Sequence, residues 1–223
     1  MRACPSGARA NLKVRMSVPI QYIPAVFSLA AVGVWGASDF LGGVGARRAN
    51  AFLFTAIVHL SGMMLMGMLA LFLRSPIPSA DSAMWAMLAG ALGGTALAFF
   101  YRSLASGNMG LIAPVAAVLS AAIPTIVTAF KVGFPGTRHI LGFILAGIGV
   151  WLISRTEAGS DRPKGLGMAM LSGCGFAGFY LCIHRAGDGS PLWIAAFSRS
   201  ASLLVTGVIV LAEDTSVQFQ PRH

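Results

Sequence analysis

The chain alternates between long apolar runs and short polar breaks, at the spacing of membrane-crossing helices. A helix needs about twenty apolar residues to cross a hydrocarbon core about 30 Å thick. Proline- and glycine-containing breaks at 75–78 and 134–136 interrupt the apolar pattern. The predicted helices cover residues 25–45, 51–73, 83–104, 109–130, 138–153, 165–183 and 192–211. The pattern predicts an all-α membrane protein, a polytopic bundle of about 7 transmembrane helices.

Composition supports a membrane protein and excludes a soluble globule. Of 223 residues, 56% are hydrophobic and 10% are charged, whereas soluble domains carry about 25% charged residues. The net charge of +9 is spread over the breaks between apolar runs, as in the loops of membrane proteins. The expected partner is therefore the lipid bilayer, and no nucleic acid is expected.

Polar segments divide the chain. A basic tail, residues 1–24, is expected in the cytosol, and the lysines and arginines slightly favour a cytoplasmic N-terminus for a multi-pass protein of the cell membrane. If Met16 is the true start, four of these charges disappear, and the preference with them. The expected divisions are the tail 1–24, a five-helix unit 25–154, a polar linker 155–164, a two-helix unit 165–212 and a polar tail 213–223.

An internal repeat relates the first two helices to the last two. Displacing the chain by 140 positions pairs His59 with Arg199 and Phe40 with Tyr180. Small and apolar pairs also match: Gly33 with Gly173, Ala37 with Ala177, Leu41 with Leu181, Ala56 with Ala196 and Gly67 with Gly207. Because five helices separate the two copies, the second copy inserts upside down, which predicts an inverted repeat of the kind found in transporters.

Three ionisable residues lie inside predicted spans. Asp39 must face the bundle interior, where it either carries a proton or cation or pairs with Arg47, Arg48 or Arg102. His59 either packs as a hydrogen-bonded side chain or lines an interior. Arg199 is harder to explain by packing alone, and it shares a polar helix face with Ser198, Ser202 and Thr206.

The third and fourth predicted helices carry further signals. Ala86, Gly90, Gly94 and Ala98 recur at four-residue steps, a stripe that allows close backbone approach in lipid. One more step reaches Arg102, beside Tyr101, which faces protein or a water-filled cavity or else extends to the headgroups. Pro114 and Pro124 each free a carbonyl one turn earlier, a feature of substrate paths that ordinary membrane helices share.

The sequence lacks the patterns of cofactor and enzyme sites. Cys4, Cys174 and Cys182 have no zinc-ligand spacing and are expected to be packing residues. The sequence contains no HExxH, GxSxG or GxxxxGK[ST] motif. We therefore expect no metal, no cofactor, no ATP use and no enzyme activity.

Two stretches resemble the EamA-type transporters of the drug/metabolite transporter superfamily. The residues 35–43, WGASDFLGG, are similar to the opening of that family, and the residues 98–114 are similar to its passage from third to fourth helix. The resemblance implies ten helices in two five-helix inverted repeats around a central cavity. His59 stands where the family usually has an arginine, and Arg199 holds the equivalent place in the second copy. The second repeat stops after two helices, so the chain is expected to be either a truncated product or one half of a homodimer.

The expected function is secondary transport of a small metabolite or drug-like solute by alternating access, coupled to protons or to an exchanged counter-solute. The candidate path residues are Trp35, Asp39, His59, Tyr101, Arg102, Pro114, Tyr180 and Arg199. The alternatives are a non-transporting truncated product, a structural or signalling membrane subunit and, less favoured, an intramembrane enzyme.

Overall fold

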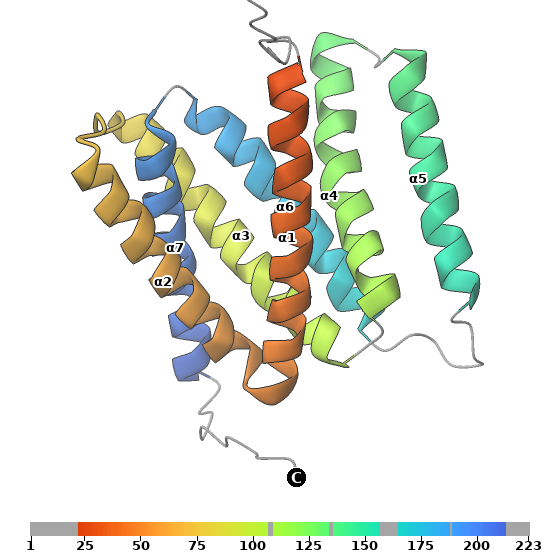
Figure 1. Cartoon of the computed structure of the whole chain (residues 1–223), viewed down its shortest axis with the longest axis horizontal. Helices are drawn as coiled ribbons and strands as arrows, with labels where there is room; N and C mark the ends of the chain where they lie inside the picture. The colour runs from red at the N-terminus through yellow and green to blue at the C-terminus, as the bar shows by residue number, and fades with distance from the viewer. Residues whose placement is uncertain (1–21, 107–108, 134–135, 157–164, 188, 213–223) are drawn as a thin grey trace, which may run out of the picture. The chain divides into compact units, whose positions relative to one another are not determined.

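The computed structural model describes residues 22–106, 109–133, 136–156, 165–187 and 189–212. The regular structure in these ranges is helical (Figure 1), which confirms the predicted all-α class. The helices are α1 (Ile23–Arg48), α2 (Ala51–Phe72), α3 (Ala80–Ser106), α4 (Met109–Val132), α5 (Thr137–Thr156), α6 (Leu166–Ala186) and α7 (Pro191–Ala212). The predicted tails and linker, 1–24, 155–164 and 213–223, lie largely outside the described residues. The chain divides into compact units 1–38 and 39–223, and the packing contacts given below lie within the second.

The helix ends follow local chemistry. The side chain of Asn50 accepts hydrogen bonds from the backbone N–H groups of Phe52 (2.9 Å) and Leu53 (3.2 Å), so it caps the start of α2. Arg74 follows the other end of α2 with a φ of 49°, a left-handed conformation that takes the chain out of the helix. The predicted boundaries therefore differ from the observed ones by only a few residues.

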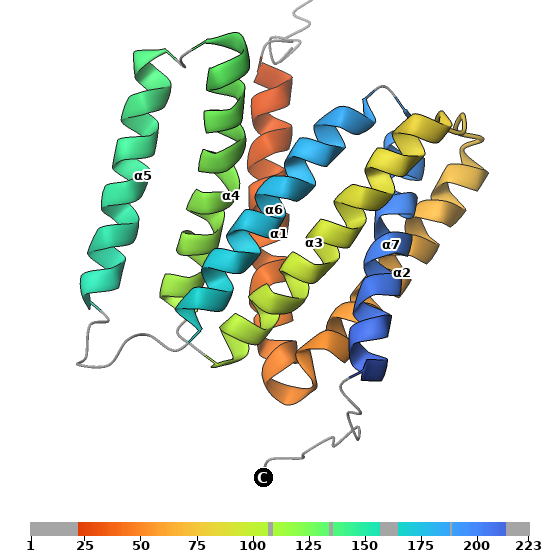
Figure 2. The same ribbon diagram turned by 180° about the vertical axis from the view of Figure 1, so that it is seen from behind.

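Six of the helices in the described ranges are long and apolar enough to cross a membrane, all except α5. The prediction of seven counted α5 as well, but its described apolar stretch, Ile140–Gly149, is shorter than a span. The arrangement of its neighbours nevertheless requires a return crossing, since α4 and α6 pack side by side and run in the same direction (Figures 1 and 2). The 20 residues of α5 extend about 30 Å, which is sufficient to bring the chain back.

The last two helices insert between helices of the first set. Figure 2 shows α6 between α3 and α4, and α7 packs against both α2 and α3. As a result, α3 lies between α6 and α7, although these two are consecutive in the sequence. The two helices of the unit 165–212 thus pack against α2, α3 and α4.

Small residues bring α3 and α7 into backbone contact. A Cβ atom added at Gly90 would overlap the backbone of Ser198, and one added at Gly94 would lie 2.6 Å from Cβ of Ser202. The hydroxyl of Ser202 donates a hydrogen bond to the Gly90 carbonyl (2.7 Å), across the interface. The close approach predicted for the stripe is therefore confirmed.

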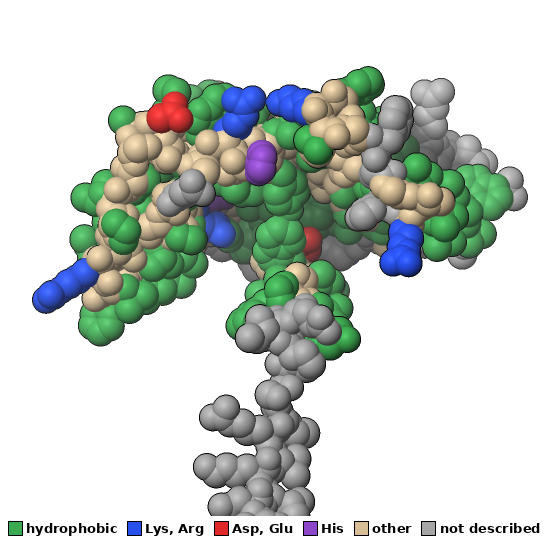
Figure 3. All heavy atoms as spheres, turned by 90° about the horizontal axis from the view of Figure 1, so that it is seen from above, with side chains coloured by type: hydrophobic (Ala, Val, Ile, Leu, Met, Phe, Trp, Pro, Cys, Tyr) green, Lys and Arg blue, Asp and Glu red, His purple; other side chains and the backbone are tan. Residues whose placement is uncertain are grey.

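The flanks of the helices are apolar and exposed, as the sides of a bundle in lipid must be. Phe72, Phe130 and Leu211 each expose more than four-fifths of their surface. In Figure 3, hydrophobic side chains cover much of the visible face and the lysine and arginine side chains are separated from one another. Because such a surface is not solvated by water, the chain is an integral, multi-pass membrane protein.

Candidate functional site

The pair of helices α2 and α7 carries two ionisable side chains in its central part. These helices pack along each other and run in opposite directions (Figure 1). His59 and Arg199 are each the ninth residue of a 22-residue helix, about 12 Å along the axis from its first residue. Both residues therefore lie at a depth where a bilayer offers no water.

His59 is buried without a hydrogen-bond partner. It is 5% exposed, and neither ring nitrogen, Nδ1 or Nε2, has a partner within the described part of the chain. A buried polar group in this state costs several kcal/mol in hydrocarbon. One alternative for His59 was that it packs as a hydrogen-bonded side chain. Within the described residues, His59 does not form such a hydrogen bond.

Arg199 lies next to His59, and the two interact electrostatically. Its side chain crosses Gly62 of α2: a Cβ atom there would lie 2.5 Å from Cδ and 2.7 Å from Nε of Arg199. Glycine at position 62 leaves the space that the arginine occupies. Among the described residues, no carboxylate forms an ion pair with Arg199, so its charge has no counter-ion there.

Tyr101 extends this group of polar side chains into α3. It interacts electrostatically with Arg199 and is 2% exposed. Its ring packs over Gly42, where an added Cβ would overlap it, and edge-on against Phe54 at 5.7 Å between centroids. We call His59, Tyr101 and Arg199 the cationic cluster.

Asp39 and Tyr180 form a second polar pair, between α1 and α6. The Asp39 side chain is half-buried and interacts electrostatically with Tyr180. Arg47, one of the partners suggested for Asp39, donates to the Leu104 carbonyl from Nε and Nη2, both at 3.4 Å. A pairing of Asp39 with one of the arginines stays a prediction.

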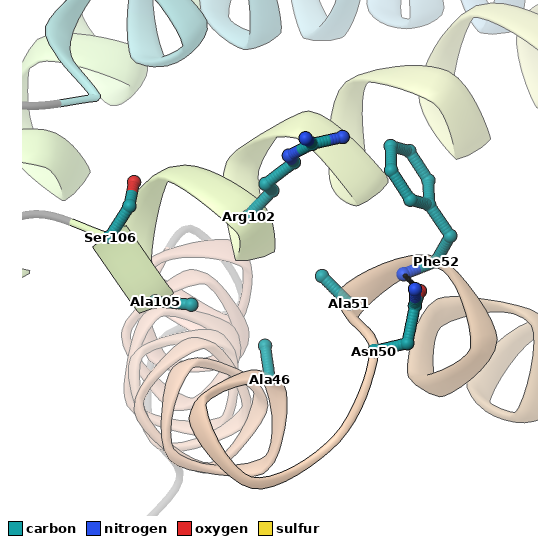
Figure 4. A pocket seen from close by; sticks show the side chains of 7 residues that line it. All are labelled: Ala46, Asn50, Ala51, Phe52, Arg102, Ala105 and Ser106. Atoms are coloured by element: carbon teal, nitrogen blue, oxygen red, sulfur yellow. Dashed lines mark hydrogen bonds between the residues drawn. The ribbon is translucent and has the colours of Figure 1, made fainter. Parts of the chain in front are cut away.

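Arg102 occupies a different place, at the end of α3. It is exposed and borders a pocket of about 320 Å³. Figure 4 shows that α3, the end of α1, the turn after it and the start of α2 supply its lining side chains, which are Ala46, Asn50, Ala51, Phe52, Arg102, Ala105 and Ser106. The guanidinium of Arg102 lies over the Phe52 ring, 5.4 Å from its centroid.

The two remaining predicted path residues are Trp35 and Pro114. Trp35 is 59% exposed and belongs to the first compact unit. Pro114 is half-buried in α4, which packs mainly on α6. These two stay candidates on sequence grounds alone.

The other polar residues on the Arg199 face of α7 take part in helix packing. Ser198, Ser202 and Thr206 are all buried. Ser198 and Ser202 are in contact with α3, and the Thr206 hydroxyl donates to the Ser202 carbonyl (2.8 Å). These side chains belong to helix packing, and only Arg199 of that face joins the cluster.

Two signals for the site were visible in the sequence. The displacement by 140 positions had paired His59 with Arg199, and Gly62 lies one turn after His59. The approach of Tyr101 to Arg199 had no sequence signal, because it depends on α7 packing against α3.

In the described ranges, no group of histidine, cysteine, aspartate and glutamate side chains is placed to hold a metal ion. Comparison with models of known protein families, with curated proteins and with solved structures finds no match to this chain.

Proposed function

We propose that this protein is a membrane carrier that moves a small metabolite or drug-like solute by alternating access. The observation that carries the proposal is the cationic cluster, in which a buried histidine and an arginine lie at mid-span without a counter-ion among the described residues. A charged side chain at this depth costs about 3 kcal/mol or more. Such a cost is typical of residues that bind a solute or ion in the membrane.

The helix arrangement supports the same proposal. His59 and Arg199, which the 140-residue displacement matches, belong to α2 and α7, two antiparallel helices in contact, and an inverted repeat would give this arrangement. In carriers of this design the binding site lies near the bilayer midplane, where the two repeats meet. The resemblance of residues 35–43 and 98–114 to EamA-type transporters agrees with this reading. We propose proton coupling or exchange against a counter-solute as the driving force.

The proposal is tested by transport in a host that lacks its own exporters. Cells producing the chain are tested with a panel of small organic acids, amino acids, amines and amphiphilic drugs, for efflux and growth tolerance. The test variants are Arg199→Gln and Asp39→Asn. Arg185→Gln is the matched control, because Arg185 is exposed at the last turn of α6. Membrane insertion is measured for every variant.

We expect the wild-type chain and Arg185→Gln to export at least one solute, and Arg199→Gln and Asp39→Asn to lose that export. If all variants insert and none differs from cells without the protein, the carrier proposal is wrong. A structural membrane subunit would then be the better description.

A further inference from the structure

The cationic cluster has the charge and donor pattern of a binding site for an anion. Arg199 contributes one positive charge, and the imidazole ring of His59 contributes an N–H donor. Asp39, an acidic residue inside a described membrane-spanning helix, interacts electrostatically with Tyr180 of α6. An occupant that lowers the electrostatic cost of this cluster must therefore be negatively charged.

We infer that His59 and Arg199 bind the carboxylate of a small monoanionic solute. This inference rests on the proposed function and names the chemical class of the substrate. Three properties of the site favour a carboxylate over other anions.

The first property is the shape of the donors. A guanidinium presents two parallel N–H groups, which match the two oxygens of a carboxylate and give a bidentate pair. Chloride is a single spherical acceptor, so it matches the two parallel N–H groups of the guanidinium less well than a carboxylate does. The side chain of Arg199 is held along Gly62, so the position of its fork is constrained by α2.

The second property is the charge balance. One carboxylate neutralises the single positive charge of Arg199, whereas a phosphate dianion would leave one uncompensated negative charge in a low-dielectric interior.

The third property is the vacant donor of His59. Its ring is 5% exposed, and both nitrogens lack partners among the described residues, so one N–H is available to a carboxylate oxygen. If His59 served only in packing, its N–H would be expected to donate a hydrogen bond to a side chain or carbonyl of the chain, because most buried donors are hydrogen-bonded.

The test uses the purified full chain in nanodiscs of phosphatidylcholine, which adds no net-anionic lipid. The probe is radiolabelled benzoate, and unlabelled benzamide, chloride and inorganic phosphate serve as competitors. Benzamide has the shape of benzoate without its charge. A parallel sample in phosphatidylglycerol nanodiscs shows whether an anionic lipid headgroup occupies the site instead.

The sharpest variant is Gly62→Ala, which keeps every charge but places a methyl group where the Arg199 side chain lies. The arginine can rotate away, so the helix pair still folds while the fork moves. Gly67→Ala is the matched control on the same helix, because a Cβ there meets no atom within 4 Å. Arg199→Gln removes the charge altogether, with Arg185→Gln as its control.

We expect benzoate to bind the wild-type chain and the Gly67→Ala and Arg185→Gln variants equally. Gly62→Ala and Arg199→Gln should each weaken binding by about tenfold or more. Unlabelled benzoate should displace the probe, and benzamide should not. Phosphatidylglycerol should not compete.

Four results would overturn the inference: equal binding of benzamide, stronger competition by chloride, phosphate or phosphatidylglycerol, unchanged affinity in Gly62→Ala and Arg199→Gln, or no benzoate binding by a folded wild-type chain. If the transport assay finds export of a neutral or cationic solute while benzoate fails to bind, the carrier proposal stands and the carboxylate inference falls. If benzoate binds as expected and no solute is exported, the binding site stands and the carrier proposal falls.

Discussion

His59 of α2 and Arg199 of α7, which are 140 residues apart in the sequence, meet at the interface of two antiparallel helices. Two equivalent helices related by a two-fold axis bring their equivalent positions together near that axis. If α2 and α7 are equivalent helices of an inverted repeat, the pairing of these residues by sequence displacement and their proximity in space have the same cause. In the carrier that we propose, the two inverted halves would meet at the interface of α2 and α7.

The contact between α3 and α7 depends on the absence of a side chain at Gly90. We expect Gly90→Ala to destabilise the bundle by about 1–3 kcal/mol, because the added methyl group would meet the Ser198 backbone, which cannot rotate away. Thermal unfolding of the purified protein in detergent checks this. Gly67→Ala, which meets no neighbour, should change the unfolding temperature far less; equal effects would show that α3 and α7 are not in close contact.

The hydrogen bond from Ser202 to the Gly90 carbonyl should contribute modestly to the same interface. Ser202→Ala removes this bond, and we expect a loss of about 0.6 kcal/mol, the average for interhelical hydrogen bonds in membrane proteins. Ser200→Ala is the control, because its hydroxyl donates to Ala196 of its own helix (2.9 Å). Thermal unfolding that ranks Ser200→Ala as the more damaging change would contradict this assignment.

The return crossing by α5 can be tested by cysteine accessibility. Single cysteines replace Val132, at the end of α4, and Gly167, at the start of α6, in a chain with Cys4, Cys174 and Cys182 changed to alanine. Both positions are exposed. A membrane-impermeant maleimide applied to intact cells should label only one of them, and with a cytoplasmic N-terminus that one is position 167. Labelling of both from the same side would show that α5 does not cross.

The helices themselves were predictable because their signals are local. Apolar runs of span length, interrupted by polar and proline-containing breaks, place all seven within a few residues, and the stripe at Gly90 and Gly94 marks a close contact. The partner of that stripe was not predictable. Small residues permit many helix pairs to approach, and the sequence does not specify that α7 is the one that fits.

The candidate site was predictable in part, because local sequence signals mark some of its residues. His59, Arg199 and Asp39 are conspicuous as ionisable residues within apolar runs, and the displacement by 140 positions linked the first two. Ser198 and Ser202 share the helix face of Arg199 but pack against α3. The sequence pattern does not show that Arg199 belongs to the candidate site while these two serines belong to helix packing. That distinction depends on α3 lying between α6 and α7, a long-range feature with no local sequence pattern.

If this protein is a carrier, the cationic cluster lies on a path that water and solute can reach, and chemical access to position 199 tests whether it does. In the cysteine-free chain, Arg199→Cys is treated in proteoliposomes with a water-soluble anionic thiosulfonate, and Thr206→Cys, fully buried on the same helix, is the control. We expect the cysteine at 199 to react readily and the one at 206 to remain unreactive. If position 199 is as unreactive as position 206, the cluster is sealed inside the bundle and the carrier account is contradicted.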